Sequence, residues 1–271
     1  MTPLQRNNVK VSGDGARAMV FAHGFGCDQN MWRFVAPAFA RDYRVVLFDH
    51  VGAGGSDVRA YSKARHGRLE GYAEDLLEIL RALQLEDVVF VGHSVSAMIG
   101  VLAALKEPAR FGHLVLVGPS PRYIDDAPGE GDYVGGFSRQ DIDGLLESLE
   151  SNYLGWSSAM APVIMGNPER PELGQELTNS FCRADPEIAQ HFARVTFLSD
   201  NRSDLPRVQT PSLVLQCSRD VIAPQAVGEY VHRHLPRSTF HLMKATGHCP
   251  NLSAPEETIA AMRSYLAQAT V

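Results

Sequence analysis

One serine in this sequence follows a strand-like run and precedes a helix-like run, and that arrangement can make a hydroxyl nucleophilic. Four β-favouring residues, Val88–Val91, lead through Gly92 to Ser94, and an apolar run of helical composition spans 95–105. A serine at the start of a helix has free backbone N–H groups and the positive end of the helix dipole beside it. A hydroxyl stays a weak nucleophile until a base and an oxyanion site serve it. Ser94 is therefore our candidate nucleophile for acyl transfer.

The string Gly-x-Ser also occurs at four other serines, whose contexts differ. Ser120 lies between two prolines, which prevent a helix from starting there. Ser138 opens a capping-box pattern and is better interpreted as a helix N-cap. No strand immediately precedes Ser56 or Ser157. Only Ser94 has the strand, the small turn and the helix in that order.

A nucleophilic serine needs a base, and the base needs a carboxylate that orients it. Candidates for both follow strand-like runs: Asp220 comes after Leu213–Cys217, and His248 comes after Thr239–Met243. The glycine that precedes His248 allows its loop to bend the imidazole toward Ser94. The sequence therefore predicts a Ser-His-Asp triad.

Each member also has a structural interpretation. Asp220 would cap a helix that begins near Ala223, and any single one of the ten histidines is more often packed or exposed than catalytic. Asp49 is a rival acid because it also ends a strand, but it precedes Ser94 and its glycine-rich loop favours a packing role. Three residues in the right order, each just past a strand, favour catalysis over these alternatives.

An oxyanion site is also predicted. The string His23–Gly26 follows the strand-like run Ala18–Ala22, and its glycines allow the backbone N–H of Phe25 to point at a developing negative oxygen. The second donor would be the N–H of Val95, the residue after the nucleophile. Without Ser94, an ordinary strand–helix turn would explain His23–Gly26 equally well.

The elements that would position these residues alternate between strand and helix, which indicates the α/β class with a mostly parallel sheet flanked by helices. Expected strands are 18–22, 44–49, 88–91, 114–117, 213–217 and 239–243. Expected helices are 30–39, 69–85, 95–106, 225–234 and 256–268.

The alternation stops between Pro119 and Leu205, where only helical patterns occur. Pro171 and Pro186 suit first helical positions, and Asp185 suits an N-cap. The expected helices there are 138–150, 152–165, 171–181 and 186–198. We expect residues 121–204 to form a four-helix cap inserted in a core of residues 1–120 and 205–271. Such a cap would cover the sheet edge where open α/β sheets bind ligands.

Bulk properties exclude several classes. The formal charge of −6 and the pI near 5.9 argue against nucleic acid or an anionic membrane as a partner. No apolar run approaches the roughly 20 residues that span a bilayer. Residues 1–10 lack the apolar segment of a signal peptide.

The four cysteines show no C-x-x-C spacing, so we expect reduced thiols and a cytoplasmic protein. Neither a metal nor a cofactor is expected.

Five strings in the sequence form a recognisable set: Gly92–Gly100, His23–Gly26, Val117–Tyr123, Gly135–Phe137 and Gly247–Pro250. Together with Asp200 and the cap, they resemble one subgroup of the α/β-hydrolase fold family, which contains the bacterial stress-response hydrolase RsbQ and the plant karrikin and strigolactone receptors. Ser96 stands where the common Gly-x-Ser-x-Gly pattern has its last glycine, and this departure is ordinary in that subgroup.

The resemblance implies the triad Ser94, Asp220 and His248, with oxyanion donors from Phe25 and Val95. It also implies a closed hydrophobic pocket that takes a small ester or a butenolide-type lactone. We assign the pocket to Phe25, Phe137, Trp156, Met160 and Phe197.

Two other functional readings stay open. The first is a ligand-sensing protein with weak or single-turnover hydrolysis, which acts through a protein partner such as a PAS-domain phosphatase. The second is cofactor-free lyase or oxygenase chemistry by His248 and Asp220, which would survive loss of the Ser94 hydroxyl.

Overall fold

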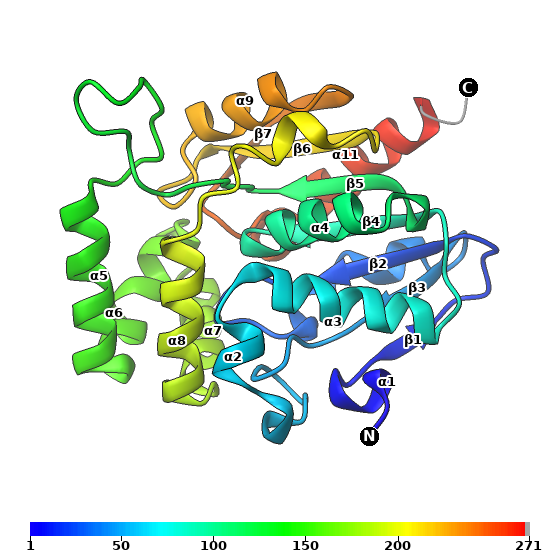
Figure 1. The fold of residues 1–271 in the computed structure, drawn as a ribbon, viewed down its shortest axis with the longest axis horizontal. Helices are drawn as coiled ribbons and strands as arrows, with labels where there is room; N and C mark the ends of the chain where they lie inside the picture. The colour runs from blue at the N-terminus through cyan, green and yellow to red at the C-terminus, as the bar shows by residue number, and fades with distance from the viewer. Residues whose placement is uncertain (269–271) are drawn as a thin grey trace.

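The computed structural model describes residues 1–268 and shows a twisted sheet with helices on both faces and further helices across one end (Figure 1). The strands are β1 (Lys10–Ser12), β2 (Ala18–Ala22), β3 (Arg44–Leu47), β4 (Val88–His93), β5 (Phe111–Val117), β6 (Ser212–Arg219) and β7 (Ser238–Thr246). Their order across the sheet is β1-β3-β2-β4-β5-β6-β7. β1 runs antiparallel to β3, and all other neighbours are parallel. The expected α/β class is therefore confirmed.

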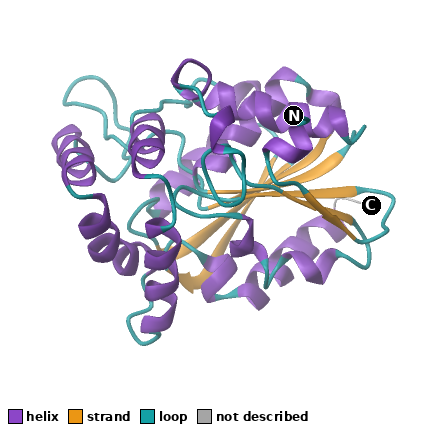
Figure 2. Cartoon of the chain, turned by 90° about the horizontal axis from the view of Figure 1, so that it is seen from below, coloured by secondary structure: helices purple, strands orange, loops and turns teal. Residues whose placement is uncertain are grey.

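Helices cover both faces of the sheet, as the edge-on view shows (Figure 2). They are α1 (Pro3–Arg6), α2 (Lys63–His66), α3 (Leu69–Ala82), α4 (Val95–Lys106), α5 (Arg139–Ser151), α6 (Tyr153–Met165), α7 (Pro171–Cys182), α8 (Pro186–Phe197), α9 (Gln225–His234), α10 (Pro250–Ser253) and α11 (Pro255–Gln268). None of the helices in residues 1–268 is long and apolar enough to cross a membrane.

Burial on both faces explains the continuous apolar strands. Met19 and Phe21 of β2 belong to the cluster under η1 (Gln29–Trp32), η2 (Ala36–Phe39) and α11. Val20 of the same strand belongs to the cluster under α3 and α4. A central strand of a parallel sheet therefore reads as apolar at every position.

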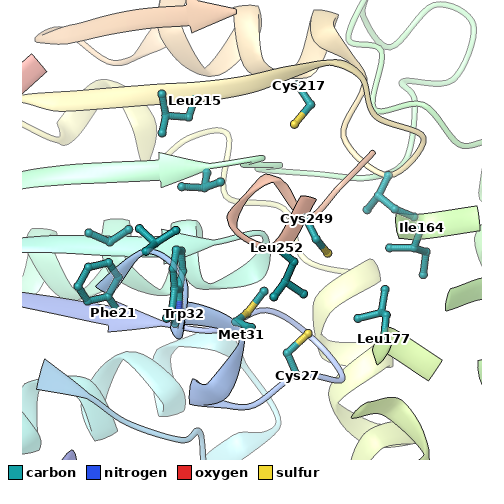
Figure 3. Packing of buried hydrophobic residues seen from close by; sticks show 14 of the residues in the cluster. Phe21, Cys27, Met31, Trp32, Ile164, Leu177, Leu215, Cys217, Cys249 and Leu252 are labelled. Carbon is teal, nitrogen blue, oxygen red and sulfur yellow. The ribbon is translucent and has the colours of Figure 1, made fainter. Parts of the chain in front are cut away.

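The four helices α5–α8 form the expected cap at the carboxyl ends of the strands (Figure 1). Pro171 and Pro186 occupy first-turn positions of α7 and α8, and the Asp185 side chain caps α8. Ser138 caps α5 in a complete capping box with Asp141. Figure 3 shows Ile164 and Leu177 of the cap facing buried core residues such as Cys27 and Leu252.

Several elements differ from the sequence expectation, among them the short helices α1, α2 and α10, which were not expected. The helix expected over 30–39 is instead a pair of short 3-10 helices, η1 and η2. Pro37 lies in the first turn of η2 and cannot donate the backbone hydrogen bond that a continuous α-helix would need there. The edge strand β1 was not expected, because all three of its residues are exposed and carry no apolar run.

Candidate active site

Ser94 lies in a strained turn between β4 and α4. Its φ and ψ of 57° and −123° fall in a region that non-glycine residues rarely adopt. Such strain costs on the order of 1–3 kcal/mol and is typical of functional sites. The Ser94 N–H donates to Val117 O at 2.8 Å, which holds the turn against β5. The fold therefore presents the Ser94 hydroxyl at the carboxyl edge of the sheet.

Two glycines are required near the site, one in this turn and one in the loop that precedes His248. A Cβ on Gly92 would lie 2.5 Å from the carbonyl oxygen of Ser96. A Cβ on Gly247, whose φ is +81°, would lie 1.9 Å from the carbonyl oxygen of Met165. The second contact confirms that a glycine is needed where the loop bends His248 toward Ser94.

The three residues of the expected triad are hydrogen-bonded to one another. His248 Nε2 lies 2.8 Å from Ser94 Oγ, and His248 Nδ1 lies 2.7 Å from Asp220 Oδ2. Asp220 Oδ1 accepts the N–H groups of Ile222 and Ala223 at 2.8 and 3.0 Å. All three triad side chains are buried. Asp220 is therefore oriented by a turn of its own, and it does not act as the N-cap of α9.

His93 holds the backbone of the candidate base, His248, in place. Its Nε2–H donates to the backbone carbonyl of His248 at 2.7 Å. Burial, together with the nearby His248 ring, lowers the pKa of His93 to about 3, so this imidazole stays neutral. A neutral donor fixes the His248 backbone without placing a positive charge beside the base.

The rival acid Asp49 holds two loops together. Its carboxylate accepts hydrogen bonds from the Asn8 side chain, from the backbone and side chain of Gln29, and from the Gly55 N–H. With its carboxylate oxygens occupied by these four donors, Asp49 does not orient the base at Ser94. The packing interpretation of Asp49 is correct.

The expected oxyanion donors are available. Among residues 1–268, no hydrogen bond joins the backbone N–H of Phe25 or of Val95 to a protein acceptor. Val95 is the first residue of α4, where the N–H has no partner within the helix. Neither N–H is therefore engaged within the described residues, which leaves both as candidate oxyanion donors.

A small apolar cavity of about 30 Å³ adjoins Ser94. This volume holds about one water molecule, so an ester must displace side chains to enter. A larger cavity of about 540 Å³ lies beyond Phe25 and Cys27, which line both spaces. The small cavity is lined by Phe25, Cys27, His93, Ser94, Tyr123, Ile164, Leu177, Phe181, Thr196, Phe197, Ile222, His248 and Cys249.

Only two of the five expected pocket residues, Phe25 and Phe197, line this cavity. Phe137, Trp156 and Met160 instead line a separate space of about 610 Å³ between α5 and α6. The Trp156 ring stacks on Phe181 at 5.7 Å, and Phe181 forms the cavity wall in its place. The structure therefore places these three side chains outside the cavity beside Ser94, because the sequence does not reveal which cap aromatic covers another.

Tyr123 is one of the wall residues that the pocket assignment missed. Burial raises its pKa to about 12, so the phenol stays protonated.

Cys27 and Cys249 also line the cavity as free thiols. Burial raises the pKa of Cys27 to about 12 and that of Cys249 well above its usual value, so neither competes with Ser94 as a nucleophile. Within residues 1–268, no cluster of three or more His, Cys, Asp or Glu side chains could hold a metal ion.

Comparison with known proteins gives near-complete matches. Residues 19–261 match the family described as the alpha/beta hydrolase family. The probable esterase D14L of Oryza sativa subsp. japonica is 41% identical, over 97% of this chain and 96% of that protein. The Karrikin insensitive 2 receptor CA of Petunia hybrida is 39% identical, over 97% and 96%. The strigolactone esterase D14 of Arabidopsis thaliana is 38% identical, over 97% of both chains.

A solved structure agrees with these matches. A hydrolase from Oleispira antarctica is 40% identical and covers 98% of this chain and 96% of that one, with a TM-score of 0.94. The cap and the core are therefore arranged together as in that hydrolase.

Proposed function

The chain belongs to the alpha/beta hydrolase family, in the subgroup of the strigolactone and karrikin receptor-esterases, and from this premise we propose that it cleaves small hydrophobic carboxylic esters or butenolide-type lactones. The observation that carries the proposal is the chain of hydrogen bonds from Ser94 through His248 to Asp220, with distances of 2.8 and 2.7 Å.

In the proposed mechanism, Ser94 Oγ attacks the carbonyl carbon while His248 Nε2 takes the hydroxyl proton. Asp220 holds the imidazole in the required tautomer and balances the imidazolium that forms. The tetrahedral oxyanion is bound by the N–H groups of Phe25 and Val95. Collapse of this intermediate passes the proton from His248 to the leaving alkoxide, and water then hydrolyses the acyl-enzyme by the same route.

The proposed substrate class follows from the walls of the cavity. Phe25, Phe181 and Phe197 surround Ser94 with apolar rings, and Tyr123 adds one protonated hydroxyl. Such walls favour a compact hydrophobic acyl or lactone group. The names of the relatives, which include a strigolactone esterase, point to the same chemistry.

Replacement of the nucleophile tests the proposal. Ser94→Ala removes the attacking oxygen and is expected to lower kcat for p-nitrophenyl acetate by at least about 10⁴-fold. Ser157→Ala is a matched control, since Ser157 is another buried Gly-x-Ser serine and, within residues 1–268, its hydroxyl donates to the Tyr153 carbonyl of its own helix α6. Unchanged turnover in Ser94→Ala would contradict the proposal and would favour the lyase or oxygenase reading.

The second candidate is a ligand sensor with slow hydrolysis, and the receptor named among the relatives favours it. In that case the cap would pass a signal to a partner such as a PAS-domain phosphatase, and both proteins would be cytoplasmic. Binding of the phosphatase of the same organism, measured with and without the ester, tests this reading. Fast multiple turnover with no ligand-dependent binding would exclude it.

A further inference from the structure

Ser96, which stands where the common elbow pattern has glycine, lies at the centre of a fully buried hydrogen-bond network. Its Oγ donates to the backbone carbonyl of His23 at 2.5 Å. His50 Nε2 lies 2.7 Å from the same Oγ and 3.2 Å from the same carbonyl. The backbone N–H of His50 donates to His23 Nε2 at 3.0 Å. The three side chains are at most 1% exposed.

The partners fix where the protons lie. His23 Nε2 accepts a backbone N–H, so Nδ1 carries the ring proton and donates to Gly24 O at 2.8 Å. The carbonyl of His23 can only accept, so the Ser96 hydroxyl donates to it, and His50 Nε2–H then donates to Ser96 Oγ. The other tautomer of His50 would bury an N–H with no partner, because Nδ1 has none within residues 1–268.

These bonds hold the peptide groups that lead to the oxyanion donor. The carbonyl of Gly24 and the N–H of Phe25 belong to one planar peptide and point in opposite directions. That carbonyl accepts from His23 Nδ1–H at 2.8 Å and from the backbone N–H of Cys27 at 3.3 Å, and these bonds fix the direction of the Phe25 N–H. Ser96 and His50 fix the preceding peptide through the carbonyl of His23.

We propose that Ser96, with His50 and His23, acts as a positioning residue that aims the Phe25 N–H at the oxyanion formed on Ser94. This proposal rests on the proposed function. It explains why the elbow carries serine in place of glycine, because glycine has no hydroxyl with which to hold the loop after β2.

The network is built to stay neutral. Burial lowers the pKa of His23 and lowers that of His50 well below its usual value. The two rings therefore favour the neutral form, which is the form that this pattern of donors and acceptors requires.

The test compares Ser96→Ala and Ser96→Gly with Ser157→Ala, which removes an equally buried serine hydroxyl in α6. Misplacing one oxyanion donor is expected to lower kcat for p-nitrophenyl acetate by about 10- to 100-fold. KM should change less than about twofold, because the oxyanion exists only after substrate binding. Affinity for a boronic acid that forms a tetrahedral adduct on Ser94 should fall by the same factor as kcat. Ser157→Ala should retain the wild-type kcat and the wild-type affinity for the boronic acid.

His50 offers a second test if the Ser96 variants fold poorly. His50→Gln retains a side-chain N–H donor and should keep most of the activity, whereas His50→Phe should lose it. The positioning role is overturned if kcat is unchanged in Ser96→Ala, or if kcat falls while boronic acid affinity is retained. These outcomes leave the proposed function intact as long as Ser94→Ala is inactive, so the two proposals fail separately.

Discussion

Asp220 divides its carboxylate between two tasks. One oxygen accepts two backbone N–H groups from its own turn, and the other accepts His248 Nδ1–H at 2.7 Å. The first set fixes the direction of the carboxylate, and the second fixes the tautomer of the imidazole. One side chain, which is only 1% exposed, therefore both orients the imidazole and balances the charge that forms on it.

Asp220→Asn should separate the two tasks. The amide oxygen retains the bonds to the turn, but an NH₂ group then faces His248 and favours the wrong tautomer. We expect kcat to fall by about 10³- to 10⁴-fold, while the melting temperature changes by only a few degrees. Ester hydrolysis kinetics measure kcat, and thermal denaturation of the same preparation measures the melting temperature. A loss of less than tenfold would show that Asp220 does not orient the base.

The arrangement of Ser94, Asp220 and His248 was predictable from the sequence because each follows a strand, and parallel strands bring their carboxyl ends to one edge. The cavity wall was not predictable in the same way. Phe137 and Trp156 share their aromatic character with Phe181 and Phe197, and only tertiary packing decides which ring faces Ser94.

At the scale of elements, the sequence signals differ in strength. Prolines and capping residues marked the starts of α5, α7 and α8, because capping is decided by local hydrogen bonds. β7 is longer than its apolar run predicted, since it is an edge strand that pairs with β6 and exposes much of its length to water. An edge strand with exposed side chains gives a weak apolar pattern.

Across the whole molecule, cap and core share one hydrophobic cluster. It contains Trp156 and Phe181 of the cap together with Phe21, Trp32 and Leu215 of the core. Arg33 reinforces the boundary with a two-point contact to Glu176 at 2.6 and 2.7 Å. The boundary of the cap, residues 121–204, therefore marks a segment of the sequence and does not separate two hydrophobic cores. We expect the cap and the core to fold and unfold together.

The two tryptophans allow this to be measured, because one lies in each part. Trp32→Phe leaves Trp156 to report on the cap, and Trp156→Phe leaves Trp32 to report on the core. In each variant the urea midpoint from fluorescence should coincide with the midpoint from far-ultraviolet circular dichroism. A cap signal that is lost at lower urea than the circular dichroism signal would indicate an independently unfolding cap.

The central claim is that Ser94 forms a covalent acyl intermediate, and mass spectrometry of the intact protein tests it most directly. The protein is mixed with excess p-nitrophenyl ester or a butenolide and quenched in acid at successive times. We predict a mass increase equal to the acyl group, located by peptide mapping on Ser94 and absent from Ser94→Ala. Rapid loss of the adduct would identify a turnover enzyme, and long persistence a sensor. An acyl group on another residue, or full turnover by Ser94→Ala, would contradict the account.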